Sequence, residues 1–302
     1  MNEDGKKLLF IVNPTAGFGH GNNLAELINI TCRKHHSASH IEFTKAPGHA
    51  TELSYNAAAN GFHQVVAVGG DGTINEVAKG LLHTGIPMAM VPQGSGNGLA
   101  RHLHIPLNIR QALHSIFDSK LITMDTFTVN GKLSLNISGI GFDGHVTNLF
   151  GIKSTRGFIG YIALSITEFF KFREFNTEII TPEKKLVRDA FIIAIANSSQ
   201  YGNNAIIAPT ASVCDGLLQL NIVRKVPFYR LDFIYSIFSG NIGRSSYCEI
   251  IEADSVSIKT DIPVYYHIDG EACGLEDTFE ISIQQSSLKV LVPKCEATKS
   301  KL

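Results

Sequence analysis

Residues 65–76 of this 302-residue chain read Val-Val-Ala-Val-Gly-Gly-Asp-Gly-Thr-Ile-Asn-Glu. The apolar run at its start suits a strand that is buried on both faces of a parallel sheet. Three glycines then surround Asp71, and glycine lets a ligand approach the main chain closely. Thr73-x-x-Glu76 has the spacing of a capping box, which predicts a helix that begins here and continues to about Gly80.

A strand, a glycine turn and a helix N-terminus in this order form a candidate phosphate site. The free N–H groups of a first helical turn and the helix dipole both favour an anion. Asp71 has the wrong charge for direct contact with phosphate, so a metal ion or ordered water is expected between them. The plainer interpretations are that Thr73 and Glu76 only cap the helix and that the glycines only form a turn.

Residues 8–117 alternate between strand and helix patterns, which predicts a parallel sheet covered by helices. Besides the central strand, strands are expected at 8–12, 41–44 and 88–91, and helices at 22–34, 49–60, 99–103 and 108–117. In such sheets ligands bind at the carboxyl ends of the strands. Glycine-rich turns begin at Asn13, Gly69 and Pro92, each at such an end, so they can face one crevice.

After about Met124 the pattern changes to short alternating runs, typical of antiparallel strands in a sandwich or open barrel. Strands are expected at 126–129, 132–137, 177–180, 190–196, 217–223, 256–259, 264–268, 279–283 and 288–292, and helices at 157–172 and 228–240. Asn130-Gly131 is a two-residue hairpin signal. The predicted fold is therefore an α/β domain over 1–124 followed by a mainly antiparallel β-sandwich domain over 125–302, with the last residues free to return to the first domain.

Composition excludes several classes of function. The formal net charge of −1 does not favour a nucleic-acid partner. Five scattered cysteines without a C-x-x-C pair are typical of reduced thiols in a cytoplasm. No apolar stretch has the length of a transmembrane helix, and the N-terminus lacks the features of a signal peptide. A cytoplasmic protein without a transmembrane segment is expected.

Two motifs of the second half contain candidate polar sites. Residues 139–144 match G-x-G-x-x-G, but they follow a hairpin-type strand rather than opening a βαβ unit, so we expect a glycine-rich turn that presents Asp143. The irregular stretch 201–217 contains Asp215-Gly216. A loop that offers main-chain carbonyls and one carboxylate suits Mg²⁺, although this pair is equally explained as a turn into the next strand.

Residues 267–271, His-Ile-Asp-Gly-Glu, place two acids around a glycine at the end of a β run. Asp269 and Glu271 are close enough in the sequence to repel each other, so we expect either a raised pKa for one of them or a metal that they share. A carboxylate near phosphate and a hydroxyl substrate is a natural general base. The simpler alternative is a hairpin turn with surface acids.

The segments 157–172 and 228–238 are rich in phenylalanine and apolar on most faces. Core packing is the default interpretation, and the flanking basic residues also suit a lipid-facing lid or membrane contact. No G-x-x-x-x-G-K-[ST] loop and no kinase-type His-Arg-Asp loop occurs in the sequence. A nucleotide would therefore have to bind at the glycine turns.

Six segments follow one another along the chain: Asn13-Pro14-x-Ala16-Gly17, Gly69-Gly70-Asp71-Gly72-Thr73-x-Asn75-Glu76, Pro92-x-Gly94-Ser95-x-Asn97-x-x-Ala100-Arg101, Gly139-x-Gly141-x-Asp143, Asp215-Gly216 and Ile268-Asp269-Gly270-Glu271. Together they resemble the diacylglycerol kinase catalytic family, specifically the bacterial soluble lipid kinases related to sphingosine kinases. The resemblance covers almost the whole chain. Two positions depart from it: Gly98 stands where many members have an acid, and Ser95 where threonine is common.

The resemblance implies ATP and Mg²⁺ as cofactors and direct transfer of the γ-phosphoryl group to the hydroxyl of diacylglycerol or a related long-chain lipid. Glu271 would be the catalytic base with Asp269 beside it, and Asp71 would organise the catalytic Mg²⁺. A structural Mg²⁺ would bind at Ser212, Asp215 and Leu217, partly through main-chain carbonyls. The nucleotide-binding roles fall on Asn13, Thr44, Gly69, Gly70, Asp71, Gly72, Thr73, Ile74, Asn75, Glu76, Gly94, Ser95 and Asn97.

The expected partners are ATP and a lipid met at the inner face of the membrane, and a homodimer is one candidate assembly. Two other functions stay open. An NAD kinase or related sugar kinase shares Gly-Gly-Asp-Gly and the Asn-Glu pair, and a non-catalytic lipid-binding protein would keep the fold. The acids Asp71, Asp269 and Glu271 speak against the latter. The lipid itself cannot be identified from the sequence.

Overall fold

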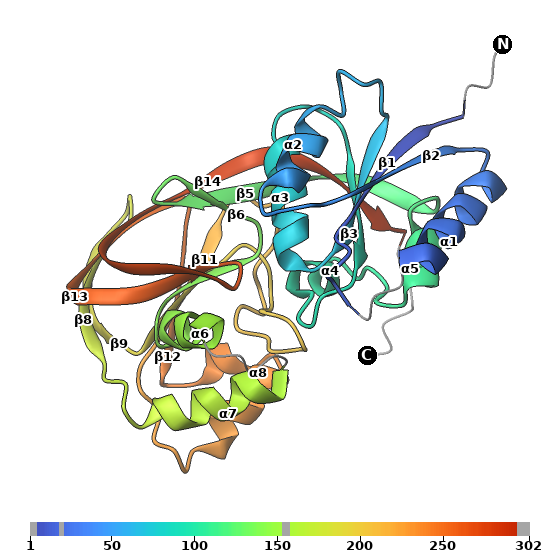
Figure 1. Ribbon diagram of the computed structural model, residues 1–302. Coiled ribbons are helices and arrows are strands. Elements are labelled where there is room, and N and C mark those ends of the chain that lie inside the picture. The colour runs from blue at the N-terminus through green and yellow to red at the C-terminus, as the bar shows by residue number, and fades with distance from the viewer. Residues whose placement is uncertain (1–4, 18–20, 153–157, 295–302) are drawn as a thin grey trace, which may run out of the picture. The chain divides into compact units, whose positions relative to one another are not determined.

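The structure is a computed structural model that describes residues 5–17, 21–152 and 158–294 (Figure 1). The chain divides into two compact units. The first comprises Met1–Met124 together with the chain from Ser287 onward, and the second comprises Asp125–Ser286. Residues 18–20, Gly157 and residues 295–302, which fall in segments considered above, lie outside the described residues. No helix in the described ranges is long and apolar enough to cross a membrane.

The first unit is a parallel sheet with helices on both faces. Its strands pair in the order β4-β3-β1-β2, and Val290 of β14 (Glu271–Pro293) adds a parallel pair with Met88 at the β4 edge. The strands are β1 (Lys7–Val12), β2 (Ala38–Phe43), β3 (Gln64–Gly69) and β4 (Met88–Pro92). The helices are α1 (Gly21–Lys34), α2 (His49–Tyr55), α3 (Asp71–Leu81), α4 (Gly98–His102) and α5 (Ile109–Ser115).

Side-chain alternation along the strands explains this layering. Leu8, Phe10 and Val12 pack with apolar residues of α1 and α5 on one face, while α2 and α3 lie over the other (Figure 1). All six residues of β3 are buried, as expected for a central parallel strand. The burial of both faces therefore follows from the continuous apolar run that the sequence shows there.

Helix α2 ends at Tyr55, five residues before the end predicted from its alanine-rich pattern. The side-chain amide of Asn56 donates a hydrogen bond to the Glu52 carbonyl at 3.0 Å, and the Ala57 N–H bonds three residues back to Ser54. Such side-chain competition and tightening are typical of helix termini. The remaining residues up to Gly61 form turns.

Helices α2 and α3 approach each other at Gly80, where an added Cβ would lie 2.1 Å from Ser54 Oγ and 2.4 Å from the Thr51 carbonyl oxygen. We expect Gly80→Ala to lower the free energy of unfolding by about 1–3 kcal/mol, because overpacking outweighs the gain in helix propensity. Urea denaturation measures the change. Gly151→Ala is the control, since nothing lies within 4 Å of its added Cβ. Equal urea midpoints for the two variants would show that α2 can move away from the added methyl group without lowering the free energy of unfolding.

The second unit is built on antiparallel strands in the order β12-β11-β10-β7-β13-β14. Its strands are β5 (Ser119–Val129), β6 (Lys132–Ser134), β7 (Ile137–Gly141), β8 (Phe175–Ile180), β9 (Lys185–Ala190), β10 (Ile192–Ala196), β11 (Leu218–Val223), β12 (Cys248–Ala253), β13 (Ser255–Ile268) and β14. Its helices are α6 (Phe142–Ile152), α7 (Phe158–Phe169), α8 (Leu231–Phe238) and the short 3₁₀ helix η1 (Ile242–Arg244). Phe127, Tyr266 and Phe279 are the largest side chains of its buried core.

The predicted fold class, an α/β domain followed by a mainly antiparallel β domain, is confirmed. The hairpin at Asn130-Gly131 is confirmed too, with φ of 49° and 76° at its two turn residues. The runs at 256–259 and 264–268 form one strand, β13, whose register shifts between Lys259 and Val264. Strands β9 and β12 were not predicted from the sequence.

Candidate functional site

The glycine turn of the first unit leads directly from β3 into α3. The helix begins at Asp71 with extended Gly70 as its N-cap, and no side chain among the described residues caps it. The predicted capping box is therefore wrong. The hydroxyl of Thr73 instead accepts a hydrogen bond at 3.1 Å from the side-chain amide of Asn13, in the loop after β1. No capping side chain in the described ranges bonds to the first-turn N–H groups of α3, and the one acid of this turn, Asp71, accepts from the N–H groups of Asn97 and Gly98 instead.

Glu76 stabilises a different helix. Its carboxylate accepts hydrogen bonds from the N–H groups of Gly48 at 2.9 Å and Ala50 at 3.1 Å, at the N-terminus of α2. Thr51 Oγ1 also donates to the Glu76 carbonyl at 2.9 Å. A carboxylate at a helix N-terminus is favoured by the unpaired N–H groups and the dipole. Glu76 therefore holds α2 against α3.

Asp71 connects α3 to the third glycine turn. One carboxylate oxygen accepts from the Asn97 N–H at 2.9 Å and the other from the Gly98 N–H at 3.0 Å. Asn97, at φ of 51°, closes the turn on itself by bonding to both main-chain groups of Gly94. The departure at Gly98 leaves this contact intact, because the donor is a main-chain group.

The second and third glycine turns touch. A Cβ on Gly94 would lie 2.8 Å from the Gly70 Cα atom, so both positions need the smallest residue. Nearby, the side-chain amide nitrogen of Gln93 is buried without a hydrogen-bond partner among the described residues. A polyphosphate fits this arrangement, because it accepts hydrogen bonds from main-chain N–H groups and from a buried donor such as the Gln93 amide, and the two glycines let it approach the main chain closely.

The other residues of this unit that were predicted to bind a nucleotide differ in their surroundings. Ser95 is exposed on the third turn, and Gly72 and Asn75 are partly buried in the first turns of α3. Thr44 follows β2, and its N–H bonds to the Val12 carbonyl at 2.9 Å. The side chain of Ile74 is only 1% exposed in the core, so it can offer a ligand only its main chain.

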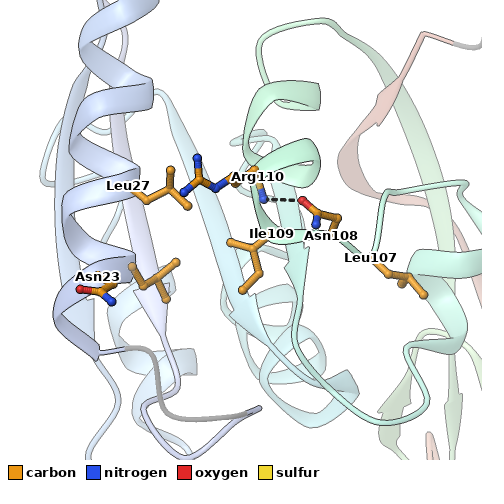
Figure 2. A pocket seen from close by; sticks show the side chains of 7 residues that line it. Asn23, Leu27, Leu107, Asn108, Ile109 and Arg110 are labelled. Carbon is orange, nitrogen blue, oxygen red and sulfur yellow. Dashed lines mark hydrogen bonds between the residues drawn. The ribbon is translucent and has the colours of Figure 1, made fainter.

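Figure 2 shows a separate pocket of about 440 Å³ in the first unit. It lies between α1 and the start of α5, where the Asn108 side chain caps the helix by accepting from the Arg110 N–H at 3.1 Å. Its lining contains none of the glycine-turn residues: Asn23, Leu24, Leu27, Leu107, Asn108, Ile109 and Arg110. This pocket therefore does not belong to the candidate phosphate site.

The second unit contains a buried carboxylate at Asp143. The glycine-rich turn predicted at 139–144 is wrong, because Gly141 ends β7 and α6 begins at once with Phe142. Asp143 is 7% exposed and accepts hydrogen bonds from the Gly144 N–H and the Tyr201 hydroxyl, both at 2.8 Å. A Cβ on Gly139 would lie 1.8 Å from its carboxylate oxygen. Gly139 thus makes room for the acid.

His267 joins this carboxylate to the turn between β13 and β14. Its Nε2 atom lies 3.4 Å from Asp143 Oδ2, and its Nδ1 atom accepts from the Gly270 N–H at 3.2 Å. That acceptor role leaves the proton on Nε2, facing the acid. Burial, and then the nearby Asp143 carboxylate, raise the pKa of Tyr201 well above its usual value, so its hydroxyl stays a donor.

The two acids of the turn differ in environment. The Asp269 carboxylate accepts three hydrogen bonds from residues 134–136: the Ser134 hydroxyl at 2.7 Å and the N–H groups of Leu135 at 2.8 Å and Asn136 at 2.9 Å. Asp269 therefore fixes the turn. Glu271 is exposed at the first position of β14, opposite Ile268 across the hairpin. Of the pair, Glu271 is therefore the one whose side chain is exposed.

The loop predicted to bind structural Mg²⁺ is anchored by an acid that the sequence analysis missed. Asp125 is 2% exposed, and its carboxylate accepts from the N–H groups of Gly216 at 2.8 Å and Ser286 at 2.6 Å. Asp215 accepts from the Leu217 N–H at 3.1 Å. No group of three or more His, Cys, Asp or Glu side chains suited to a metal occurs in the described ranges. Because Mg²⁺ keeps several waters, the Asp215 carboxylate and two main-chain carbonyls of the loop still fit it as ligands.

Variants that keep only one of the two polar contacts of His267, the hydrogen bond from Gly270 or the 3.4 Å approach to Asp143, test the cluster. We expect His267→Ala to lower the free energy of unfolding by about 1–3 kcal/mol for each buried group left unpaired. His267→Asn can still accept from Gly270, and His267→Gln can still donate toward Asp143, so each is expected to lose less than alanine. Urea denaturation of the three variants gives the values. If the alanine variant is as stable as the unchanged protein, the cluster does not support this turn.

Two family models match the chain in succession. The diacylglycerol kinase catalytic domain matches residues 7–129, and the YegS C-terminal NAD kinase beta sandwich-like domain matches residues 137–292. A "Probable lipid kinase YegS-like" of Pseudomonas syringae pv. syringae (strain B728a) is 29% identical over 78% of both chains. One of the same name from Serratia proteamaculans (strain 568) is 28% identical over 95% of both chains.

Among solved structures, a diacylglycerol kinase from Bacillus anthracis str. Sterne superimposes with a TM-score of 0.72 at 22% identity, covering 95% of this chain and 97% of that one. At that identity the likeness concerns the fold, which agrees with the two units described above. The second family model alone spans more than half of the chain, and the order of the two models is that of the two units. The chain therefore belongs to the family of the YegS C-terminal NAD kinase beta sandwich-like domain, which here follows a diacylglycerol kinase catalytic domain.

Proposed function

We propose that this protein is an ATP-dependent lipid kinase that transfers the γ-phosphoryl group of ATP to the hydroxyl of diacylglycerol or a related long-chain lipid. The observation that carries the proposal is the pair of glycine turns held together by Asp71, which accepts from the N–H groups of Asn97 and Gly98. Rigid turns with exposed main-chain donors suit the phosphates of a nucleotide, and phosphoryl transfer depends chiefly on positioning and charge stabilisation.

ATP would be held by residues of the first unit. The N–H groups at the start of α3 and the Ser95 hydroxyl face the phosphates in this proposal, with Asn13 and Thr73 supporting the loop through their mutual hydrogen bond. Mg²⁺ supplies positive charge that offsets the phosphate oxygens. Asp71 uses both oxygens on main-chain donors, so we propose that it organises the ion through water rather than by direct coordination.

Glu271 would act as the general base. It is exposed, whereas the Asp269 carboxylate accepts three hydrogen bonds that fix the turn, so we assign the proton transfer to Glu271. It would accept the proton of the lipid hydroxyl as the phosphoryl group is transferred. Ser212, Asp215 and Leu217 would hold a second, structural Mg²⁺ in the loop that Asp125 anchors.

An NAD kinase is the alternative, because the C-terminal family model is described as NAD kinase beta sandwich-like. The lipid reading is favoured by the names of the sequence relatives and by large apolar side chains that stay exposed on the second unit, Phe170 and Phe228 among them. A non-catalytic lipid-binding protein is disfavoured because the turn keeps an exposed acid.

A radiolabelled-ATP assay with diacylglycerol micelles beside NAD tests the proposal. Labelled lipid is expected, and labelled NADP with unlabelled lipid would show the alternative to be right. A lipid extract scored by mass spectrometry of phosphorylated products then identifies the substrate. We propose a cytoplasmic enzyme that meets its lipid at the inner membrane face. Light scattering of the same preparation tests the homodimer.

A further inference from the structure

Helix α7 carries an apolar stripe that faces solvent. Ile162 and Ile166 lie four residues apart, which places them on one face of the helix, and Phe170 is the first residue after it; their exposed fractions are 39%, 61% and 63%. The opposite face packs inward, where Leu164 and Phe169 contact the cluster around Phe142 and Phe191. The helix is therefore apolar on both sides although only one side is buried. Helices of water-soluble proteins normally carry polar residues on the outer side.

Helix α8 and the residues before it repeat this arrangement. Phe228 and Tyr229 are each 68% exposed, and Ile234, Tyr235 and Phe238 are 51%, 73% and 48% exposed. The buried contacts of α8 are made instead by Phe233 and Ile237, which pack against the cluster below the helix. Five large apolar side chains thus point away from the core here.

The two exposed sets are continuous. The rings of Phe170 and Phe228 have centroids 6.1 Å apart, and Lys225 Nζ lies 5.3 Å from the centre of the Phe169 ring. Both helices belong to the second unit. We call this surface the α7–α8 face; it consists of Ile162, Ile166, Phe170, Phe228, Tyr229, Ile234, Tyr235 and Phe238. Contiguous exposed apolar patches of this kind mark sites of association.

The segments that contain the α7–α8 face have more basic than acidic residues. Residues 158–174 and 224–245 contain six basic side chains against three acidic ones, in a chain whose net charge is −1. The three acids are all engaged: Glu168 with Lys171, Asp232 with Arg230, and Glu174 with the Lys225 N–H. The basic residues are Lys171, Arg173, Arg224, Lys225, Arg230 and Arg244. This excess is complementary to a negatively charged surface.

We propose that the α7–α8 face docks on a bilayer surface that contains anionic lipids. The proposal rests on the function proposed above and specifies the surface through which the protein reaches its substrate's membrane. Aromatic and aliphatic side chains would enter the boundary between headgroups and acyl chains, and the basic residues would meet the lipid charges. Tyrosines such as Tyr229 and Tyr235 suit this boundary, because the ring is apolar and the hydroxyl stays hydrated.

Vesicle sedimentation with the full chain tests the docking surface. The probes are phosphatidylcholine vesicles with and without phosphatidylglycerol, each at low and high salt. We expect binding to need phosphatidylglycerol and to weaken with salt. A variant with Phe170→Ser, Phe228→Ser and Tyr235→Ser is expected to bind at least tenfold more weakly. The matched control changes Val187→Ser and Leu121→Ser, which are 54% and 52% exposed outside the face, and is expected to bind as before.

Further measurements distinguish loss of the docking surface from unfolding, from dimer dissociation and from loss of turnover. Thermal unfolding shows whether the triple variant is folded, and Arg173→Gln with Arg224→Gln provides a second variant that leaves the apolar residues in place. Unchanged vesicle binding by both variants would overturn the proposal. It would also be overturned if the protein were a dimer that dissociates in the triple variant while vesicle binding is retained. Vesicle binding requires no turnover. Binding without lipid phosphorylation would therefore reject the proposed function and keep the docking surface, and phosphorylation without binding would do the reverse.

Discussion

Glu271→Gln is expected to lower kcat by about 10²–10⁴-fold, the usual contribution of a positioned general base. The amide keeps the size of the side chain but cannot take the proton of the lipid hydroxyl. Glu271 is exposed at the start of β14, and glutamine keeps the size and polarity of its side chain, so we expect little change in stability. The affinity for ATP should also stay the same, because no residue of the proposed phosphate cradle is altered.

The measurement is steady-state kinetics with the lipid found in the extract screen, beside isothermal titration with ATP. Glu276→Gln is the matched control, since Glu276 is an exposed acid on the same strand and should retain full kcat. A drop in both kcat and ATP affinity would point to a nucleotide role for Glu271. Normal turnover by the glutamine variant would remove the residue from the mechanism.

Asp71→Asn is expected to weaken ATP binding by about 10–150-fold, equivalent to about 1.5–3 kcal/mol for a hydrogen bond to a charged group. The carboxylate presents two acceptors to the N–H groups of Asn97 and Gly98. An amide presents one acceptor and one donor, so one of these N–H groups faces another N–H. The third glycine turn would then lose its fixed position against Gly70.

Isothermal titration with ATP and Mg²⁺ measures the loss, and urea denaturation checks that the fold is retained. Asp118→Asn is the control, because Asp118 is a 78% exposed acid whose pair with Lys294 contributes little. ATP binding by Asp71→Asn that equals that of the control would show that the turn keeps its shape without the carboxylate. Neither the charge nor the two acceptors of Asp71 would then be needed to bind ATP, and the role proposed for Asp71 would be rejected.

The capping box shows how a local pattern can be right about a helix and wrong about its contacts. Thr73 and Glu76 have the spacing of the motif, and a helix does begin there. Their side chains, however, bond to Asn13 and to the N-terminus of α2, which are distant in sequence. A capping box relies on contacts within one turn, and here tertiary packing offers each side chain a partner that the spacing cannot reveal.

The G-x-G-x-x-G segment shows a different limit. Its glycines indicate a flexible turn when only the sequence is considered. In the fold, Gly139 leaves space for the Asp143 carboxylate, and Gly144 lies where a Cβ would be 2.4 Å from the Tyr265 carbonyl oxygen. Glycine serves close packing as well as turns, and the sequence does not distinguish the two uses. Helix α6 was missed for this reason.

The sequence of this protein was sufficient to deduce the order of strands and helices, the two-part fold and the family. Apolar periodicity and glycine spacing are local properties of the chain, and these deductions depend on them. The positions of Asn13, Gly69 and Pro92 at strand ends followed from the same patterns. Tertiary structure alone decided which acid is buried and which is exposed. Asp269 is held by residues 134–136 and Asp143 by Tyr201 and His267, while Glu271 stays exposed. Burial and hydrogen bonding depend on segments that are far apart in the chain. Acidic residues that cannot be told apart in the sequence therefore have different environments in the fold.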